Sequence, residues 1–216
     1  MKLEDIRRDY LKNRKSGLHR EDMASSPFEQ FSVWMEEAIS AEFTADPTAM
    51  CLSTVNEHGA PSQRVVLLKH FDPDGFVFYT NLGSRKAKEI EANANVCLHF
   101  GWLPMERQVI IYGKAVKLSI AQATQYFMSR PKSSQLAAWT SHQSQPISSR
   151  KLLMQSFEQI KHRFSQGEVP LPSFWGGYRV VPTAIEFWQG GGDRLHDRFM
   201  YQYDDQQQWS IERLQP

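Results

Sequence analysis

The sequence has little cysteine, almost no net charge and no long hydrophobic run. Its two cysteines, Cys51 and Cys97, lie in apolar, strand-like stretches. They are too few for a disulfide framework and have no metal-ligand spacing, so we expect buried, reduced thiols. The 25 basic and 24 acidic residues leave a net charge of +1. That balance argues against a general nucleic-acid binder, so any anion site must be local.

Membrane-spanning and secretory signals are also missing. The longest purely aliphatic run is Val65-Val66-Leu67-Leu68, which is far too short to cross a bilayer. The first five residues include two acids and begin no apolar stretch, unlike a signal peptide. We therefore expect a soluble, cytoplasmic protein that does not bind membranes.

Several common catalytic motifs do not occur. No Gly-x-Gly-x-x-Gly follows a predicted strand, which argues against a Rossmann dinucleotide site. No Gly-x-Ser-x-Gly is present, so a serine hydrolase of that type is not indicated. The seven histidines have no metal-ligand spacing with each other or with cysteine, and we expect no metal site.

The hydrophobic pattern predicts a single domain over residues 1–216, in which short strands and turns dominate. A charged helix over 3–14 and a polar connector make residues 1–25 a mobile N-terminal segment. Further helices are expected over 26–41, 84–93, 119–130, 133–140 and 148–164. Strands are expected over 49–55, 63–70, 76–80, 96–100, 108–118, 178–181, 185–189, 194–203 and 209–214. A meander with one inserted helix suggests a small antiparallel barrel.

The first helix after the N-terminal segment has an apolar stripe. Ser26-Pro27-Phe28-Glu29 is a capping box with proline at the first helical position. The stripe that follows at helical spacing should face the core, and its members are Phe28, Phe31, Trp34, Met35 and Ile39.

Two groups of polar residues could hold phosphate. The first comprises Arg64, Lys69, Tyr79, Thr80, Arg85 and Lys86, the last two in the first turn of a helix. Cations there oppose the helix dipole unless an anion lies between them, although a solvated surface is the alternative. Arg64 and Lys69 face opposite ways in an ideal strand, so they share a ligand only through a bulge, a strand end or a twist.

The second group is weaker and follows the first along the chain. Tyr126 and Arg130 have i,i+4 spacing on one helix face, and Ser134 comes just after Pro131. Their hydroxyl and guanidinium donors would suit a second phosphate.

A third group lies near the end of the chain, where an aromatic-rich strand runs into Gly190-Gly191-Gly192. If residues 194–199 are extended, Arg194, His196 and Arg198 share one face, with Leu195, Asp197 and Phe199 on the other. They then either meet solvent around a satisfied histidine or bind an anion. Trp188 adds an indole suited to stacking on a flat ring.

The C-terminal stretch Glu186-Phe187-Trp188-Gln189, four residues, then Arg194-Leu195-His196-Asp197-Arg198, resembles a motif of the pyridoxamine 5′-phosphate oxidase family. Other blocks resemble that family in the same order along nearly the whole chain. They are Gln63 to Lys69, Phe78 to Asn81 with Ser84-Arg85-Lys86, Glu106 to Val109, Ser129-Arg130-Pro131 and Phe174 to Gly177.

The resemblance implies a mainly β fold with flanking α-helices, an antiparallel split β-barrel of the FMN-binding type. It also implies a homodimer with FMN at the subunit interface. The implied FMN contacts are Arg64, Val65, Val66, Leu67, Leu68, Lys69, Tyr79, Thr80, Arg85, Lys86, Gln108, Gln143, Ser144, Trp188 and Arg198. The implied substrate contacts are Lys69, Tyr126, Arg130, Ser134, Arg194 and His196. Arg194 and His196 would also act in catalysis, together with three residues that close over or flank the substrate, Arg7, Tyr10 and Asp46.

The implied activity is oxidation of pyridoxamine or pyridoxine 5′-phosphate to pyridoxal 5′-phosphate, with oxygen as electron acceptor and hydrogen peroxide as product. That reaction is the last step of pyridoxal phosphate synthesis in vitamin B6 salvage. Two alternatives remain: a split-barrel flavin reductase with another substrate, and a non-catalytic pyridoxal phosphate carrier.

Overall fold

The computed structural model describes residues 9–10 and 17–216. The helices are α1 (Pro27–Ser40), α2 (Arg85–Ala92), α3 (Ile120–Ser129), α4 (Lys132–Thr140) and α5 (Arg150–Arg163), with short 3-10 turns at Arg20–Asp22, Leu103–Met105 and Gly192–Arg194. The strands are β1 (Ala49–Val55), β2 (Pro61–Leu67), β3 (His70–Asp72), β4 (Gly75–Asn81), β5 (Asn95–Trp102), β6 (Arg107–Lys117), β7 (Trp175–Gln189), β8 (Asp197–Tyr203) and β9 (Trp209–Leu214). The helix predicted over 3–14 lies almost entirely outside the described residues.

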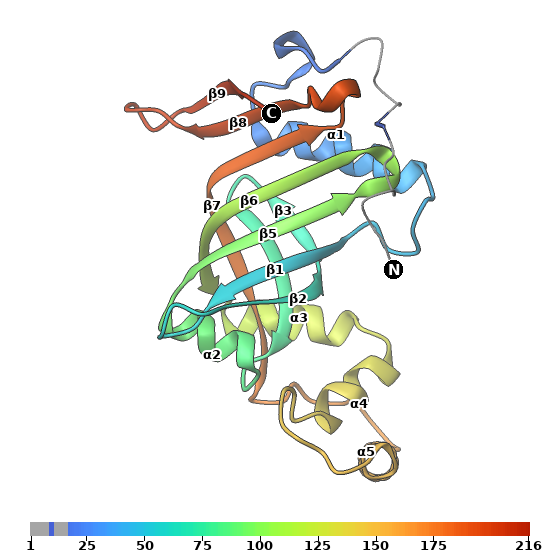
Figure 1. Cartoon of the computed structure of the whole chain (residues 1–216). Coiled ribbons are helices and arrows are strands. Elements are labelled where there is room, and N and C mark those ends of the chain that lie inside the picture. The colour runs from blue at the N-terminus through green and yellow to red at the C-terminus, as the bar shows by residue number, and fades with distance from the viewer. Residues whose placement is uncertain (1–8, 11–16) are drawn as a thin grey trace.

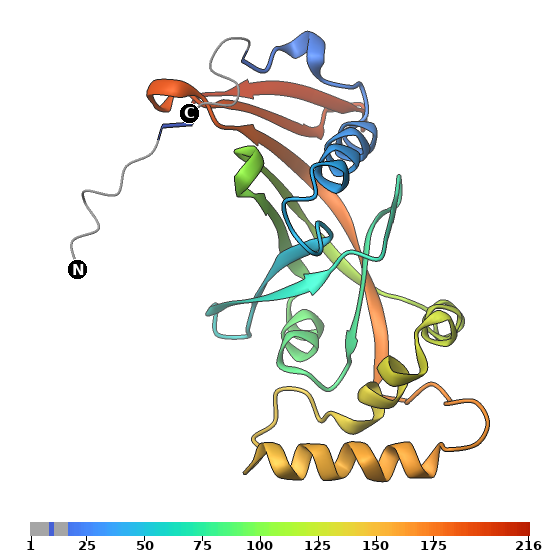
Figure 2. The ribbon, with the colours of Figure 1, turned by 90° about the vertical axis from the view of Figure 1, so that its right-hand side faces the viewer.

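The strands form one antiparallel sheet in the order β2-β1-β5-β6-β7-β4-β3, and β8 and β9 continue from β7. The sheet curls into a half-barrel with helices around it (Figure 1). Turning the molecule shows α1 beside the barrel and α4 and α5 gathered at the end away from β8 and β9 (Figure 2). The predicted mainly β fold with flanking helices is confirmed.

Strand β7 organises this sheet because two different strands share one of its edges. Its first half pairs with β4 from Trp175 to Val180, and its second half pairs with β8 from Ala184 to Gln189. Along the other edge it pairs with β6 from Tyr178 to Gln189. The sequence predicted two strands here. The structure has one continuous strand with a bulge, because the register shifts opposite Gly113 and leaves Thr183 as the extra residue. The bulge requires glycine at position 113, since a β-carbon there would lie 2.3 Å from the Val181 carbonyl oxygen.

The chain changes partners at the end of β2. The backbone N–H of Leu68 donates to Thr48 beside β1, whereas the N–H of Lys69 donates to Val77 in β4. The strand expected over 63–70 is therefore two strands, β2 and β3. After this change Lys69 lines a cavity together with Val65, Val66 and Leu67, whereas Arg64 is not among its lining residues.

Helix α1 begins as predicted, since the Ser26 side chain accepts a hydrogen bond from the N–H of Phe28. Its stripe faces the core, with Phe31 fully buried and Trp34 only 2% exposed. The inclusion of Ile39 was wrong: it is 53% exposed, and the core position in the last turn belongs to Ala38.

Part of the N-terminal segment packs on the barrel. Leu18 and Met23 are buried in the main core. The backbone N–H of Leu18 donates to Asp197 at 2.8 Å, and its carbonyl oxygen accepts from Arg213 at 2.6 Å. No periodic pattern predicts this packing, because the anchoring partners, Asp197 and Arg213, lie near the other end of the chain. Mobility of residues 1–25 remains a prediction.

Phe31 should be a main determinant of stability, because its ring meets those of Phe71, Phe76 and Phe100 at centroid distances of 4.9–5.1 Å. We expect Phe31→Ala to lower the free energy of unfolding by about 3–5 kcal/mol through lost burial and a residual cavity. Urea denaturation followed by circular dichroism measures the change. Ile39→Ala, on the exposed face of the same helix, is the matched control; equal effects of the two would contradict this view of the core.

Candidate functional site

A buried lysine lies at the start of α2. Lys86 is 7% exposed, and its ammonium group donates to Gln143 Oε1 at 2.8 Å and to Thr80 Oγ1 at 3.1 Å. Both partners are neutral, and none of the ion pairs found in the described part of the chain involves Lys86. Burial, and then the nearby Arg64, lower its pKa to about 8. A buried cation without a counterion is costly unless an anion binds there.

Behind Lys86, a carboxylate and an arginine form a tight network. Arg64 Nη2 donates to Glu89 Oε2 at 3.1 Å, and Glu89 Oε1 accepts from Arg85 Nε at 2.8 Å. Burial raises the pKa of Glu89, but hydrogen bonds from Ser62, Thr54, Arg85 and Arg64 outweigh it and hold the pKa at about 2. This carboxylate is therefore ionised across the physiological range.

A cavity of about 380 Å³ opens beside Lys86. Most members of the first two residue groups predicted to bind phosphate line this cavity. Its lining includes Val65, Val66, Leu67, Lys69, Tyr79, Thr80, Lys86, Tyr126, Arg130 and Gln143. Trp175, Asn81, Ala137, Ala138 and Ser141 also line it, although the sequence did not assign them to the site. Trp175 lies within a block quoted for the family resemblance, and that was the available signal.

The floor of this cavity is a stack of aromatic rings with a cation above it. The rings of Tyr79 and Tyr126 stack at 3.9 Å, and Tyr79 stacks on Trp175 at 5.3 Å. The Arg130 guanidinium carbon lies 4.9 Å from the Trp175 ring centroid. Arg130 Nη1 is buried without a hydrogen-bond partner in the described structure. Arg130 thus lines a polar cavity and keeps one guanidinium N–H group unsatisfied, a combination suited to an anionic ligand.

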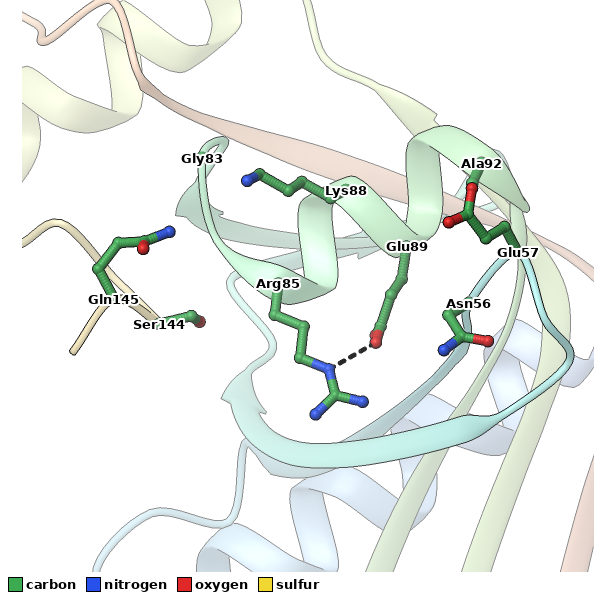
Figure 3. A pocket seen from close by; sticks show the side chains of 9 residues that line it. All are labelled: Asn56, Glu57, Gly83, Arg85, Lys88, Glu89, Ala92, Ser144 and Gln145. Carbon is green, nitrogen blue, oxygen red and sulfur yellow. Dashed lines mark hydrogen bonds and ion pairs between the residues drawn. The ribbon is translucent and has the colours of Figure 1, made fainter.

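A second cavity, of about 440 Å³, lies along α2 from Arg85 to Ala92 (Figure 3). Arg85 and Ser144 point into it, together with Lys88 and Gln145. Two of the predicted cofactor contacts, Arg85 and Ser144, thus lie next to the first cavity rather than in it. Lys86 and Gln143, their neighbours in the chain, face the first cavity.

A third group gathers at the far end of β7. The Tyr10 ring lies 5.5 Å from that of Trp188 and 5.4 Å from that of His196, both edge-on. The Gly191 N–H donates to His196 Nδ1 at 3.2 Å, so the neutral ring carries its proton on Nε2. Burial, and then Arg194, lower the pKa of His196 below its usual value. At neutral pH this histidine is therefore an uncharged hydrogen-bond donor at Nε2.

The prediction of an extended strand from residue 194 was wrong. Strand β8 begins at Asp197, and Arg194 ends a 3-10 turn. Asp193 and Arg194 have φ values of 53° and 63°, in the left-handed region. Two such residues in succession cannot belong to a strand, so alternation does not place Arg194 beside His196. Arg194 is exposed at the turn, and Leu195 is exposed rather than in the core.

The face of β6 and β7 opposite the core carries the remaining predicted cofactor contacts. Gln108 pairs with Trp188, and Trp188 pairs with Arg198. Gln108 is hydrogen-bonded to His99 at 2.9 Å, and Arg198 Nε donates to the buried Glu186 at 2.7 Å. These side chains are held in place on an open sheet surface rather than within either cavity described above.

Within one chain, the predicted residues therefore form two separate sets. The Lys86 cavity lies among β2, β4 and helices α2 to α4, whereas Trp188, His196 and Arg198 lie at the opposite end of the molecule (Figure 1). Ser134 is in the first turn of α4 but is not among the cavity-lining residues. Leu68 is buried in the core. Asp46 caps the turn before β1 by accepting from the Thr48 N–H at 3.0 Å. Arg7 lies outside the described residues.

Two absences hold for the described residues, 9–10 and 17–216. No group of three or more His, Cys, Asp or Glu side chains could hold a metal ion. No helix in this part of the chain is long and apolar enough to cross a membrane.

Comparison with known proteins gives full-length matches. Residues 35–164 match the family model described as pyridoxamine 5′-phosphate oxidase, and residues 175–216 match the pyridoxine 5′-phosphate oxidase C-terminal dimerisation region. The pyridoxine/pyridoxamine 5′-phosphate oxidase of Hahella chejuensis is 66% identical over 216 residues, covering 100% of both chains. The protein of the same name from Pseudoalteromonas translucida is 58% identical, also covering 100% of both chains.

Solved structures agree on the fold. PhzG from Burkholderia lata, in complex with tetrahydrophenazine-1-carboxylic acid, superposes with a TM-score of 0.86 at 28% identity, over 93% of this chain and 98% of that one. A pyridoxamine 5′-phosphate oxidase-related, FMN-binding protein from Nostoc punctiforme has a TM-score of 0.72 at 18% identity, over 90% of this chain and 100% of that one, and supports the fold alone. The predicted split barrel is confirmed, and the chain belongs to the pyridoxamine 5′-phosphate oxidase family.

Proposed function

We propose that this protein oxidises pyridoxamine 5′-phosphate or pyridoxine 5′-phosphate to pyridoxal 5′-phosphate, with FMN as cofactor and oxygen as electron acceptor. The observation that carries the proposal is the Lys86 cavity, which is lined by the buried Lys86 and by Arg130, whose guanidinium group has an unsatisfied N–H among the described residues. Relatives up to 66% identical over the full length bear the name of this oxidase.

The residues present fit FMN. Lys86, Arg64 and Arg85 would hold its phosphate, because they supply three cations around the start of α2. The backbone and side chains of 65–69, with Tyr79, Thr80 and Gln143, would line the rest of the cofactor. When bound, FMN supplies hydride acceptance from the substrate carbon that bears the amine or hydroxyl, and oxygen restores its oxidised form with release of hydrogen peroxide.

The remaining polar groups suit the substrate. Lys69, Tyr126 and Arg130 line one wall of the cavity, and the free Arg130 Nη1 would take a phosphate oxygen. We also assign Ser134 to this phosphate. Vitamers without a phosphate should therefore bind more weakly, because the buried N–H group of Arg130 stays unsatisfied in their complexes.

Arg194 and His196 would orient the pyridine ring. His196 is uncharged near neutral pH, and no hydrogen bond from its Nε2–H is found among the described residues, so it can hold a ring substituent without adding a charge. Arg194 supplies a cation on a turn fixed by backbone geometry. Tyr10 packs against His196 and would cover one side of the ligand. We place Arg7 and Asp46 in the same role only through the family resemblance.

The complete site would form between two copies of the chain. Lys86 and Arg130 lie at one end of the molecule, whereas Trp188, His196 and Arg198 lie at the other. A two-fold axis would bring one set from each copy together, and residues 175–216 match a dimerisation region. Gln108, Trp188 and Arg198 would then meet the FMN held by the partner copy, and two equivalent sites would result.

The absorption spectrum of the purified protein tests the function. We expect a flavin spectrum that bleaches on anaerobic addition of pyridoxamine 5′-phosphate and returns with oxygen. A flavin that does not bleach would instead favour a reductase with another substrate. A protein without flavin absorption, showing at most an aldehyde band, would favour a pyridoxal phosphate carrier.

Arg194→Ala should separate binding from turnover. Because Arg194 is exposed at a turn, we expect the variant to retain flavin and its oligomeric state but to bleach at least tenfold more slowly with pyridoxamine 5′-phosphate, the equivalent of about 1.4 kcal/mol. Stopped-flow absorbance measures the rate. Leu195→Ala, at the neighbouring exposed position, is the control and should bleach normally. If Arg194→Ala bleached at the wild-type rate, the C-terminal turn would not be part of the active site.

The charge of Lys86 should make FMN affinity fall at alkaline pH. Burial lowers its pKa to about 8 in the free protein, so above that pH phosphate binding must first restore the proton. We expect the dissociation constant to rise by up to about tenfold per pH unit above pH 8, and the contribution of Lys86 to be constant with pH below it. Quenching of flavin fluorescence by apo-protein measures the affinity.

Lys86→Ala should lose this dependence and bind FMN about 10- to 150-fold more weakly at neutral pH, as expected for removal of a charge-assisted hydrogen bond of about 1.5–3 kcal/mol. Lys161→Ala, on the exposed face of α5, removes the same charge far from the cavity and should leave both the affinity and its pH profile unchanged. An unaltered affinity in Lys86→Ala would contradict the assigned role.

Mixed dimers test whether the site spans two chains. Lys86→Ala and Arg198→Ala homodimers should each oxidise substrate poorly. In a mixed dimer, one site contains both substitutions and the other contains neither, so co-expression with two different affinity tags should recover about half of wild-type activity per dimer. If each site were built from a single chain, the mixed dimer would remain as inactive as its parents.

A further inference from the structure

The proposed phosphate site contains a carboxylate whose role the cofactor does not explain. Glu89 lies on α2, one turn after Arg85, with 5% of its side chain exposed. It is paired with both Arg64 and Arg85. Figure 3 shows Arg85 and Glu89 joined along the helix at the edge of the second cavity. A negative charge beside an anion site should weaken anion binding unless the carboxylate does something else.

The hydrogen bonds of Glu89 occupy both of its oxygens. Oε1 accepts from Arg85 at 2.8 Å. Oε2 accepts from Thr54 at 2.5 Å, from Ser62 at 2.6 Å and from Arg64 at 3.1 Å. The carboxylate therefore links β1, β2 and α2 at one point.

The guanidinium group of Arg64 is fixed from several sides by the same network. Its Nη1 donates to Thr54 Oγ1 at 2.5 Å and to the Leu52 carbonyl at 3.3 Å, and its Nη2 donates to Ser62 and Glu89. Thr54 and Ser62 thus each accept from Arg64 and donate to Glu89. These bonds use four of the five guanidinium N–H groups and leave Nε–H for a further acceptor. A planar group held in this way keeps one orientation, so little ordering cost remains when an anion binds.

We propose that Glu89 is a positioning residue, which holds Arg64 and Arg85 in the orientation that receives the FMN phosphate. This inference rests on the proposed function, since it needs FMN as the ligand. Glu89 does not touch the phosphate in this assignment and acts only through the two arginines. Lys86 lies three residues before it in the same short helix, so the network also fixes the helix that carries the buried ammonium.

Two physical effects of removing the charge have opposite signs. If Glu89 acted only as a nearby charge, Glu89→Gln would relieve repulsion and FMN would bind more tightly. If Glu89 positions the arginines, the variant loses strong hydrogen bonds to both, and FMN binds more weakly. The direction of the change in affinity therefore separates the two roles.

The experiment compares FMN with riboflavin, which lacks the phosphate, on apo-protein by flavin fluorescence quenching. We expect Glu89→Gln to weaken FMN binding about tenfold and to leave riboflavin binding unchanged, so that the preference for FMN falls by the same factor. A general loss of structure would weaken both ligands alike. Glu91→Gln removes the same charge at an exposed position of α2 and should leave the preference unchanged.

Ser62→Ala provides a second measurement if Glu89→Gln does not fold. It removes one hydrogen bond to the carboxylate and one acceptor of Arg64 while keeping every charge. We expect the FMN preference to fall about fivefold, the equivalent of roughly 1 kcal/mol, with unchanged riboflavin binding.

Equal or tighter FMN binding by Glu89→Gln, or by Ser62→Ala where only that variant folds, would overturn the positioning role while leaving the proposed function intact. A wild-type protein that does not prefer FMN over riboflavin would instead overturn both. If the wild-type protein prefers FMN over riboflavin, and Glu89→Gln loses this preference while Glu91→Gln keeps it, both the positioning role and the proposed function are supported.

Discussion

The division of one edge of β7 between β4 and β8 is the constraint on which the molecule depends. A fifteen-residue strand cannot pair with a single seven-residue neighbour along its whole length. The first half therefore closes toward β4, and the second half leaves the barrel to pair with β8. This geometry places Trp175 at one end of the strand, in the cationic cavity, and Trp188 at the other, beside His196. One continuous strand thus sets the distance between the two sets of functional residues.

The residues around the Lys86 cavity show how a protein with almost no net charge concentrates cations in one place. These cations are removed from water and bonded mainly to neutral oxygens, as at Lys86, or left with a free N–H, as at Arg130. Arg64 and Arg85 differ, because the buried carboxylate of Glu89 is part of their network. Desolvation makes each of these groups costly in the free protein, and this cost favours binding of an anion that satisfies them. Local arrangement, rather than total charge, decides the affinity.

Much of this arrangement could be predicted from the sequence, because it depends on local patterns. The cap at Ser26 and the stripe through Phe31 and Trp34 required only helical periodicity. The role of Glu89 could not be predicted, since its partners at positions 54, 62 and 64 reach it only after β1 and β2 pair. Arg194 was placed wrongly because alternation assumes extended backbone, and two left-handed residues interrupt it.

The anchoring of Leu18 has a consequence for Tyr10. Asp197, which follows His196 directly, holds the Leu18 N–H, and Arg213 holds its carbonyl oxygen. Only residues 11–17 separate Tyr10 from this fixed point in the sequence. The tyrosine ring therefore has a high effective concentration beside Trp188 and His196. An edge-on aromatic contact worth about 0.5–1.5 kcal/mol can then keep the ring in place, although the same contact between separate molecules would be negligible. Substitutions at Asp197 or Arg213 would consequently lower the effective concentration of the Tyr10 ring beside Trp188 and His196, although Tyr10 itself is unchanged.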